Sequence, residues 1–104
     1  MTFRRVAALA DVWNGDLLPI TLDGIKVLVV KIEDAVHAYE DRCAHLGAQL
    51  SNGALDGRVL TCAVHHWQYD ATTGRGINPA SACLTRFAVE IRDGIIFVDP
   101  EVRL

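Results

Sequence analysis

Closely spaced turn signals divide this chain into short pieces, and they constrain its fold more than any other feature. The signals are Asn14-Gly15, Asp23-Gly24, Asn52-Gly53, Asp56-Gly57, Gly74 with Gly76, Asn78-Pro79 and Asp93-Gly94. Gly, Asn, Asp and Pro favour turns because they adopt or fix backbone angles that regular structure avoids. A stable helix needs about ten or more residues without such breaks, so the spacing predicts many short strands.

The runs between these turns are rich in Val, Ile and other apolar residues. Aromatic residues make up only 7% of the chain, so the apolar content rests on aliphatic side chains, which suit strands. We expect strands at residues 17–22, 25–32, 35–39, 58–61, 68–69, 87–91 and 95–98. Residues 9–13 could add one helical turn, and no other segment shows helical spacing.

Two of the turn signals predict β-hairpins. Asp23-Gly24 and Asp93-Gly94 each lie between apolar runs, and both pairs can adopt the positive φ angles that match strand twist. The neighbouring strands are therefore expected to be antiparallel. A chain of 104 residues with this pattern predicts a single all-β domain, either a sandwich or a small barrel.

Charge and hydropathy exclude several kinds of protein. Ten Lys and Arg against thirteen Asp and Glu give a net charge of −3 without any basic block, which argues against nucleic-acid binding. The most apolar windows, 6–10 and 27–30, are far shorter than the roughly 20 residues of a membrane helix. Arg4-Arg5 could begin an export signal, but the apolar run after it is too short. We therefore expect a soluble cytoplasmic protein.

In the reducing cytoplasm, the three cysteines favour metal binding over disulfides.

Cysteine and histidine gather in two short segments, 43–47 (Cys-Ala-His-Leu-Gly) and 62–67 (Cys-Ala-Val-His-His-Trp). Two Cys and two His could hold zinc, as in a zinc-stabilised interaction module. However, only one residue separates Cys43 from His45, whereas the two ligands of a zinc pair are usually two to five residues apart. The set suits a binuclear iron–sulfur cluster better, because there the two ligands of one loop bind different irons, as in a Rieske centre. In the second segment, Cys-x-x-His spacing favours His65 over His66 as the ligand.

These residues carry a family resemblance. Cys43-x-His45-Leu46, Cys62-x-x-His65 and Tyr69-Asp70-x-x-Thr73-Gly74 resemble the signature of Rieske-type [2Fe–2S] proteins. Residues 74–79, Cys83-Leu84, 89–91 and Trp13 with 23–24 are similar to the ferredoxin component of multicomponent toluene-type diiron monooxygenases. The resemblance implies a Rieske-like antiparallel β-sandwich, with a single domain at 1–104 and a cluster-binding subdomain at about 42–83. It also implies that Cys43 and Cys62 hold a buried iron, while His45 and His65 hold an outer iron.

Three departures from the family's pattern argue against the high-potential respiratory class. Respiratory-chain Rieske proteins have an additional Cys in each loop, and the two form a disulfide; the corresponding residues here are Ala48 and Val64. Those proteins also have a Ser that donates a hydrogen bond to the cluster, where this chain has Trp67.

The sequence favours an electron carrier over an enzyme. Protein ligands and sulfide would fill every iron position, which leaves no open site for a substrate. The chain also lacks an evident nucleophile–base pair and a dinucleotide fingerprint. The resemblance implies an NADH-dependent flavin and iron–sulfur reductase as electron donor. The acceptor would be the terminal hydroxylase of an aromatic or hydrocarbon monooxygenase. The alternative is the ferredoxin of an aromatic ring-hydroxylating dioxygenase. We expect a monomer.

Five other residues receive structural predictions. We expect Cys83 to be a small buried hydrophobe rather than a redox-sensitive thiol. Trp13 is expected in the core and His37 on an ordinary strand face. Trp67 is predicted to shield the cluster from water or to join partner docking. The resemblance suggests that the loop at Pro79 covers the cluster.

Overall fold

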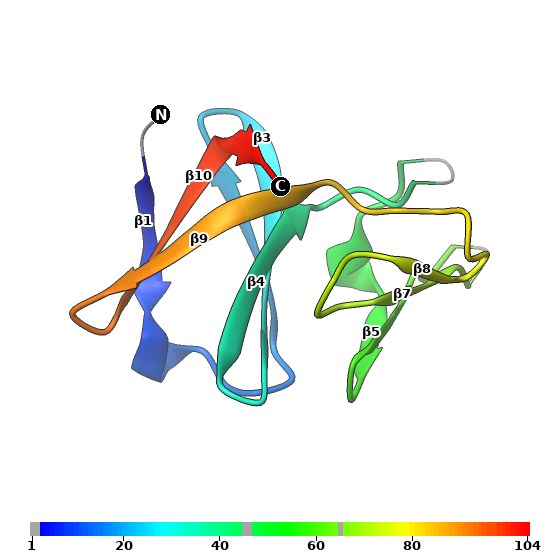
Figure 1. The fold of residues 1–104 in the computed structure, drawn as a ribbon, viewed down its shortest axis with the longest axis horizontal. Helices are drawn as coiled ribbons and strands as arrows, with labels where there is room; N and C mark the ends of the chain where they lie inside the picture. Colours follow the sequence, from blue (N-terminus) through cyan, green and yellow to red (C-terminus); the bar gives the residue numbers. More distant parts are fainter. Residues whose placement is uncertain (1–2, 45–46, 65) are drawn as a thin grey trace.

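Two antiparallel sheets form the fold (Figure 1), as described by a computed structural model for residues 3–44, 47–64 and 66–104. One sheet has six strands in the order β1-β10-β9-β4-β3-β2, and the other has four in the order β5-β6-β7-β8. The strands are β1 (Arg4–Ala8), β2 (Leu17–Leu22), β3 (Ile25–Ile32), β4 (Ala35–Glu40), β5 (Ala54–Asp56), β6 (Val59–Thr61), β7 (Gln68–Asp70), β8 (Gly76–Asn78), β9 (Arg86–Arg92) and β10 (Ile95–Arg103). The 3₁₀ turns η1 (Leu9–Asp11) and η2 (Leu50–Asn52) lie between strands. The predicted all-β antiparallel class is confirmed, and no helix in the described part is long and apolar enough to cross a membrane.

Both predicted hairpins are present. Asp23 and Gly24 have φ angles of 51° and 82°, and Asp93 and Gly94 have 51° and 74°. Two consecutive residues at positive φ make the turn that follows the right-handed twist of the strands. As a result, β2 pairs with β3 and β9 pairs with β10.

Three strands and one 3₁₀ turn were not predicted. The strands β5 and β8 contain three residues each, too few for a periodic pattern to show. The strand β1 begins with two arginines, and its place is set by pairing with β10 at the other end of the chain. The turn η2 buries Leu50 completely. These elements depend on partners that are distant in the sequence, so local composition does not indicate them.

The prediction that Trp13 lies in the core is wrong. Its side chain is 73% exposed, whereas the preceding Val12 is 3% exposed and packs in the core. Trp13 belongs to a surface turn, where its amide donates to the carboxylate of Asp16 at 2.8 Å. The turn directs one of the two neighbouring apolar side chains inward, and the smaller one occupies that place.

The strand β3 is buried on both faces. Val27 and Val29 pack in a core among the strands of the six-stranded sheet, together with Phe87. Leu28 and Val30 pack in a second core, which includes the four-stranded sheet and both Cys43 and Cys62. A strand that is covered on both sides has a continuous apolar sequence instead of an alternating one.

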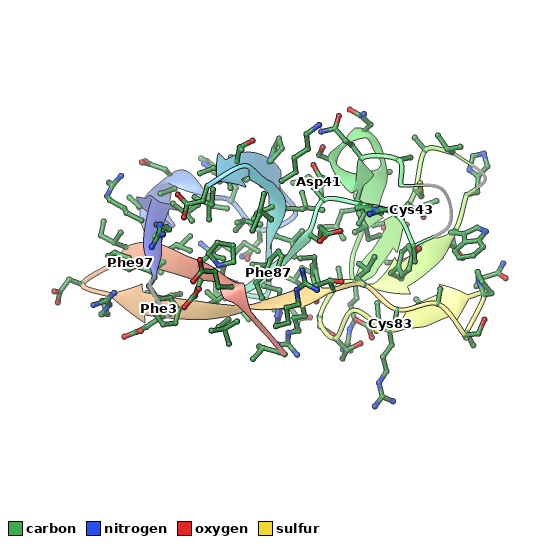
Figure 2. The ribbon with its side chains drawn as sticks, turned by 90° about the horizontal axis from the view of Figure 1, so that it is seen from above. Phe3, Asp41, Cys43, Cys83, Phe87 and Phe97 are labelled. Atoms are coloured by element: carbon green, nitrogen blue, oxygen red, sulfur yellow. The ribbon has the colours of Figure 1, made fainter. Side chains whose placement is uncertain are left out.

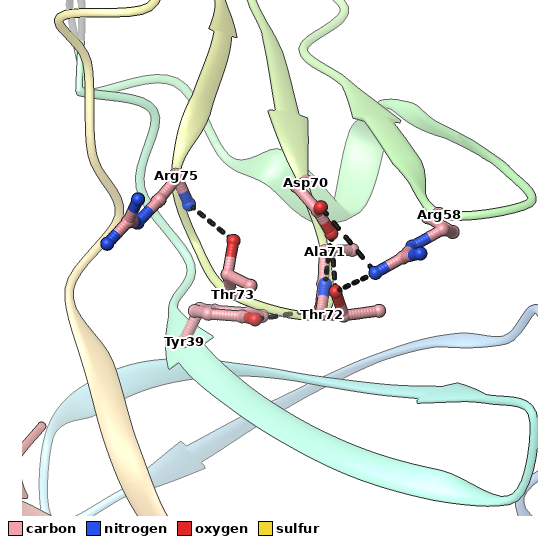
Figure 3. A network of polar contacts seen from close by, with 7 residues as sticks. All are labelled: Tyr39, Arg58, Asp70, Ala71, Thr72, Thr73 and Arg75. Atoms are coloured by element: carbon pink, nitrogen blue, oxygen red, sulfur yellow. Dashed lines mark hydrogen bonds and ion pairs between the residues drawn. The ribbon is translucent and has the colours of Figure 1, made fainter.

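Tyr39 connects β4 of the six-stranded sheet to the segment that follows β7 of the four-stranded sheet. Its ring is fully buried at the end of β4, and its hydroxyl donates to the carbonyl oxygen of Ala71 at 2.7 Å (Figure 3). Burial raises the pKa of this hydroxyl above its usual range. A Cβ atom on Gly74 would lie only 3.0 Å from the ring, so a glycine permits this close approach. These contacts hold the segment that follows β7 against the end of β4, shortly before the first Cys-His segment.

Candidate metal centre

The two Cys-His segments form loops that close in the same way. The first follows β4 and the second follows β6. The amide of Cys43 donates to the carbonyl of Ala48 at 2.7 Å, and the amide of Cys62 donates to the carbonyl of Trp67 at 2.8 Å. Each bond spans five residues and draws its loop into a compact turn.

A matching backbone bend lies four residues after each cysteine. Gly47 has a φ angle of 77° and His66 has a φ angle of 56°. Positive φ is uncommon for residues with a side chain, although His is among the more tolerant. His66 therefore occupies the bend of the second loop, at the place that glycine takes in the first.

The sulfur atoms of Cys43 and Cys62 lie together in the interior. The two cysteines are 1% and 0% exposed and belong to the same core. The pKa of the Cys62 thiol is raised, first by burial and further by Cys43, although a hydrogen bond from the Val64 backbone opposes the shift. Two adjacent buried thiolates would be strongly unfavourable without a compensating cation. The donor set therefore fits a metal centre that supplies positive charge at this point.

Tyr69 is the polar residue next to this pair. Its hydroxyl lies 3.3 Å from the sulfur of Cys43 and accepts a hydrogen bond from the amide of Ala44 at 3.1 Å. Burial is the main reason that the pKa of the Tyr69 hydroxyl is raised above its usual range. A metal-bound thiolate has no proton, so with metal present the hydroxyl is the donor to Cys43. The sequence places Tyr69 in a motif, but it does not reveal this contact.

A buried carboxylate closes the ends of the first loop. Asp41 is 3% exposed, and its two oxygens accept hydrogen bonds from the amide of Ser51 at 2.8 Å and from the hydroxyl of Ser51 at 2.7 Å. Asp41 stands two residues before Cys43, and Ser51 follows the loop. These bonds fix the separation of the loop ends. Sequence reasoning missed this clamp because its two halves are ten residues apart.

Several predicted site residues can now be placed. His45, Leu46 and His65 lie outside the described residues, so the complete ligand set Cys43, His45, Cys62 and His65 stays a prediction. Trp67 is half-buried and packs against the core that contains both cysteines. His37 lies in β4 opposite Val30, as expected for a strand-face residue, and its pKa is lowered by burial and by Arg86.

The prediction that Cys83 is buried is wrong. Cys83 is exposed, in an extended segment that leads to β9, and its sulfur contacts the backbone carbonyl of Leu84. Leu84 is 5% exposed and belongs to the core with Cys43. Side chains alternate along an extended segment, so Leu84 faces inward and Cys83 faces solvent.

Comparisons with known proteins agree with this fold and identify the family. Residues 2–88 match the Rieske [2Fe-2S] domain family. The chain is 38% identical over 98 residues to the ferredoxin component of the alkene monooxygenase system of Xanthobacter autotrophicus, covering 92% of this chain and 80% of that protein. It is 29% identical over 96 residues to the ferredoxin component of the naphthalene 1,2-dioxygenase system of Pseudomonas putida, covering 91% and 92%.

A solved structure shows the same fold over nearly the whole chain. A chain in the complex of reduced oxygenase and oxidized ferredoxin in carbazole 1,9a-dioxygenase superimposes with a TM-score of 0.90 at 32% identity, covering 98% of this chain and 96% of that one. The protein belongs to the Rieske [2Fe–2S] family, and its cofactor is a Rieske-type [2Fe–2S] cluster. The family assignment favours the cluster over a structural zinc ion.

The bend at His66 leads to a prediction about the ligands. We expect His66→Gly to keep the full iron content, because glycine adopts positive φ without strain and Gly47 already has this role. His66→Val should keep iron but lose about 1–3 kcal/mol in the free energy of unfolding, because a β-branched residue is strained there. Iron analysis and thermal unfolding provide the measurements. Loss of iron in His66→Gly would instead make His66 a ligand.

The Asp41–Ser51 clamp gives a second prediction. Asp41→Ala should lower the free energy of unfolding by about 1–3 kcal/mol, because it leaves the partly buried Ser51 amide and hydroxyl without their acceptor. The variant should also lose its cluster faster under chelation, because the loop ends are no longer fixed. Asp41→Asn, which can still accept from that amide, is the matched control. Equal rates of cluster loss in Asp41→Ala and the unmodified protein would contradict a clamping role.

Proposed function

We propose that this protein is a ferredoxin that passes single electrons from an NADH-dependent flavin and iron–sulfur reductase to a terminal oxygenase. The proposed ligands are Cys43 and Cys62 on the inner iron, with His45 and His65 on the outer iron. The observation that carries the proposal is the buried Cys43–Cys62 pair with the hydroxyl of Tyr69 beside it. The chain acts as an electron-transfer component and not as a catalyst.

Each described residue of the centre has a task in this function. When bound, the [2Fe–2S] cluster supplies reversible one-electron chemistry. Cys43 and Cys62, both buried, would hold its inner iron. Tyr69 directs a hydrogen bond to the Cys43 sulfur, which favours added negative charge there. Trp67 packs against the same core, where it would help to keep water from the cluster.

Three chain segments that include the centre and its neighbours have no charged residues. Residues 43–55, 59–69 and 76–85 contain no Asp, Glu, Lys or Arg. Val64 and Ile77 are exposed within these segments, at 44% and 47%. We name the exposed residues of the three segments the charge-free face. Electron-transfer contacts are small and short-lived, and this face offers apolar contact close to the cluster.

Placing a charge on this face should slow electron delivery. We expect Val64→Asp to reduce the rate of electron transfer to the terminal oxygenase about tenfold, because the new carboxylate must lose its water on docking. The cluster spectrum should not change. Ile91→Asp, at a position that is 42% exposed on β9, is the matched control and should be neutral. Stopped-flow spectroscopy gives both rates. The docking model fails if Val64→Asp is neutral while changes at Asp23 or Asp93 abolish transfer.

The oxygenase class is proposed from sequence identity. The alkene monooxygenase ferredoxin is the relative with 38% identity, which favours a monooxygenase partner; an aromatic ring-hydroxylating dioxygenase is the alternative. Reconstitution with each class of oxygenase, its reductase and NADH tests the choice by product formation.

We also propose a cytoplasmic monomer with one domain over 1–104 and a cluster-binding subdomain at about 42–83. Gel filtration tests the monomer.

A further inference from the structure

A groove lined by three arginines lies beside the metal centre. One part is a hollow of about 600 Å³ between residues 70–77 and the start of β9, where Arg75 and Arg86 line the wall. A smaller hollow of about 240 Å³ is lined by Arg42 together with Cys43 and Ala44 of the first loop. Cys83 lines both hollows, so they adjoin each other. We name this surface the arginine groove; Figure 2 shows Cys43 and Cys83 at the same end of the molecule.

None of these three arginines has an ion-pair partner within the described ranges, where the ion pairs are Arg4–Asp23, Arg58–Asp70 and Arg92–Glu90. Figure 3 shows the Arg75 side chain directed away from Asp70 and Arg58. Unpaired guanidinium groups in a hollow are suited to binding carboxylates, because their planar donors match two oxygens.

Two acidic residues also line the groove, and they do not cancel its charge. Asp70 accepts hydrogen bonds from the amide and hydroxyl of Thr72 at 2.9 and 2.6 Å and pairs with Arg58 at 3.8 Å. These contacts, chiefly those from Thr72, hold the pKa of Asp70 below its usual value. Asp70 therefore stays ionised, but Arg58 from outside the groove balances its charge. Glu40 lines only the smaller hollow. Three arginines then face Glu40, so the groove keeps an excess of positive charge although the whole chain has a net charge of −3.

The position of the groove relates it to docking. Arg42 immediately precedes the charge-free segment 43–55, while Arg75 and Arg86 stand on either side of 76–85. A partner that covers the charge-free face thus reaches the groove at its edge. Local charge of this kind steers encounter and fixes orientation even when the net charge of a protein has the opposite sign.

We propose that the arginine groove binds an acidic segment of the terminal oxygenase, so that apolar contact at the charge-free face is oriented by carboxylates at the groove. This inference rests on the proposed function, from which the oxygenase is taken as the partner. Its chemistry is specific: the segment is rich in Asp or Glu and lies beside the surface that receives the electron.

The first test measures carboxylate binding without any redox step. A hexaglutamate peptide is titrated into the cluster-containing protein at low ionic strength, and amide shifts of Thr85 and Arg86 are followed by NMR. Arg42→Gln and Arg75→Gln should each weaken binding about two- to fivefold, and the double variant about tenfold. Arg5→Gln, which removes an exposed arginine from β1, should have no effect. Equal binding by all variants, or no binding to the unmodified protein, would overturn the proposal.

The second test uses the oxygenase and the reductase separately. Arg75→Gln should raise the KM of the oxygenase for this protein two- to fivefold at unchanged kcat and unchanged midpoint potential, and high salt should remove the difference. The KM of the reductase should not change. A change confined to the reductase would overturn the assignment to the oxygenase. Peptide binding without any electron transfer would instead count against the proposed function.

Discussion

Cys43→Ser and Cys62→Ser are each expected to abolish the cluster, with iron falling from two per chain to nearly none and visible absorbance lost. Each substitution removes one of two thiolates from the inner iron, and a buried hydroxyl is a poor replacement because it remains protonated. Cys43 and Cys62 are 1% and 0% exposed, so both thiolates are supplied from the interior. Iron and acid-labile sulfide analysis of anaerobically purified protein provides the measurement.

Cys83→Ser is the matched control for these variants and should retain the full cluster. Cys83 is exposed and contacts its own neighbour's backbone carbonyl. Loss of iron in Cys83→Ser together with its retention in Cys62→Ser would show that the ligand assignment is wrong.

A low midpoint potential, near roughly −150 mV and thus at the low end of the Rieske range, is the second expected result. The sequence has neither the loop disulfide nor the serine of the respiratory class. The structure adds one compensating donor, the hydroxyl of Tyr69 at 3.3 Å from the Cys43 sulfur. We expect Tyr69→Phe to lower the potential by about 60 mV, because the lost hydrogen bond favours the reduced state roughly tenfold.

Protein film voltammetry measures both values, and Tyr39→Phe is the control for Tyr69→Phe. Tyr39 donates to the backbone of Ala71, so its loss should lower stability without moving the potential. A potential well above zero would return the protein to the respiratory class. An unchanged potential in Tyr69→Phe would mean that its hydroxyl does not stabilise the reduced centre.

Local sequence patterns predicted the elements that depend on local chemistry. The two Asp-Gly hairpins follow from the φ preferences of their residues, and the strand β3 follows from a run of β-branched and aliphatic residues. That Cys43 and Cys62 lie together in the interior was implied by the family resemblance of the two Cys-His segments. The Asp41–Ser51 clamp and the Tyr69 contact were not predicted, because they join residues that only the folded chain brings together.

The errors have a related cause. Trp13 and Cys83 were judged by residue type, since tryptophan and cysteine are most often buried. In each case an adjacent aliphatic residue, Val12 or Leu84, faces inward, and the backbone direction places its neighbour outside. At such positions the backbone conformation decides which of two adjacent side chains faces the core. Residue type alone does not determine this.

The burial of β3 on both faces determines how the protein unfolds. A strand with solvent on one side can separate from its sheet and leave the other layer intact. Because Leu28 and Val30 belong to the core of the cysteine pair while Val27 and Val29 belong to the other core, neither core can open without disturbing the other. Unfolding is therefore expected to be a single cooperative event, in which the electron-carrying end and the opposite end melt together. Loss of the cluster site and unfolding of the six-stranded sheet should therefore occur at the same temperature.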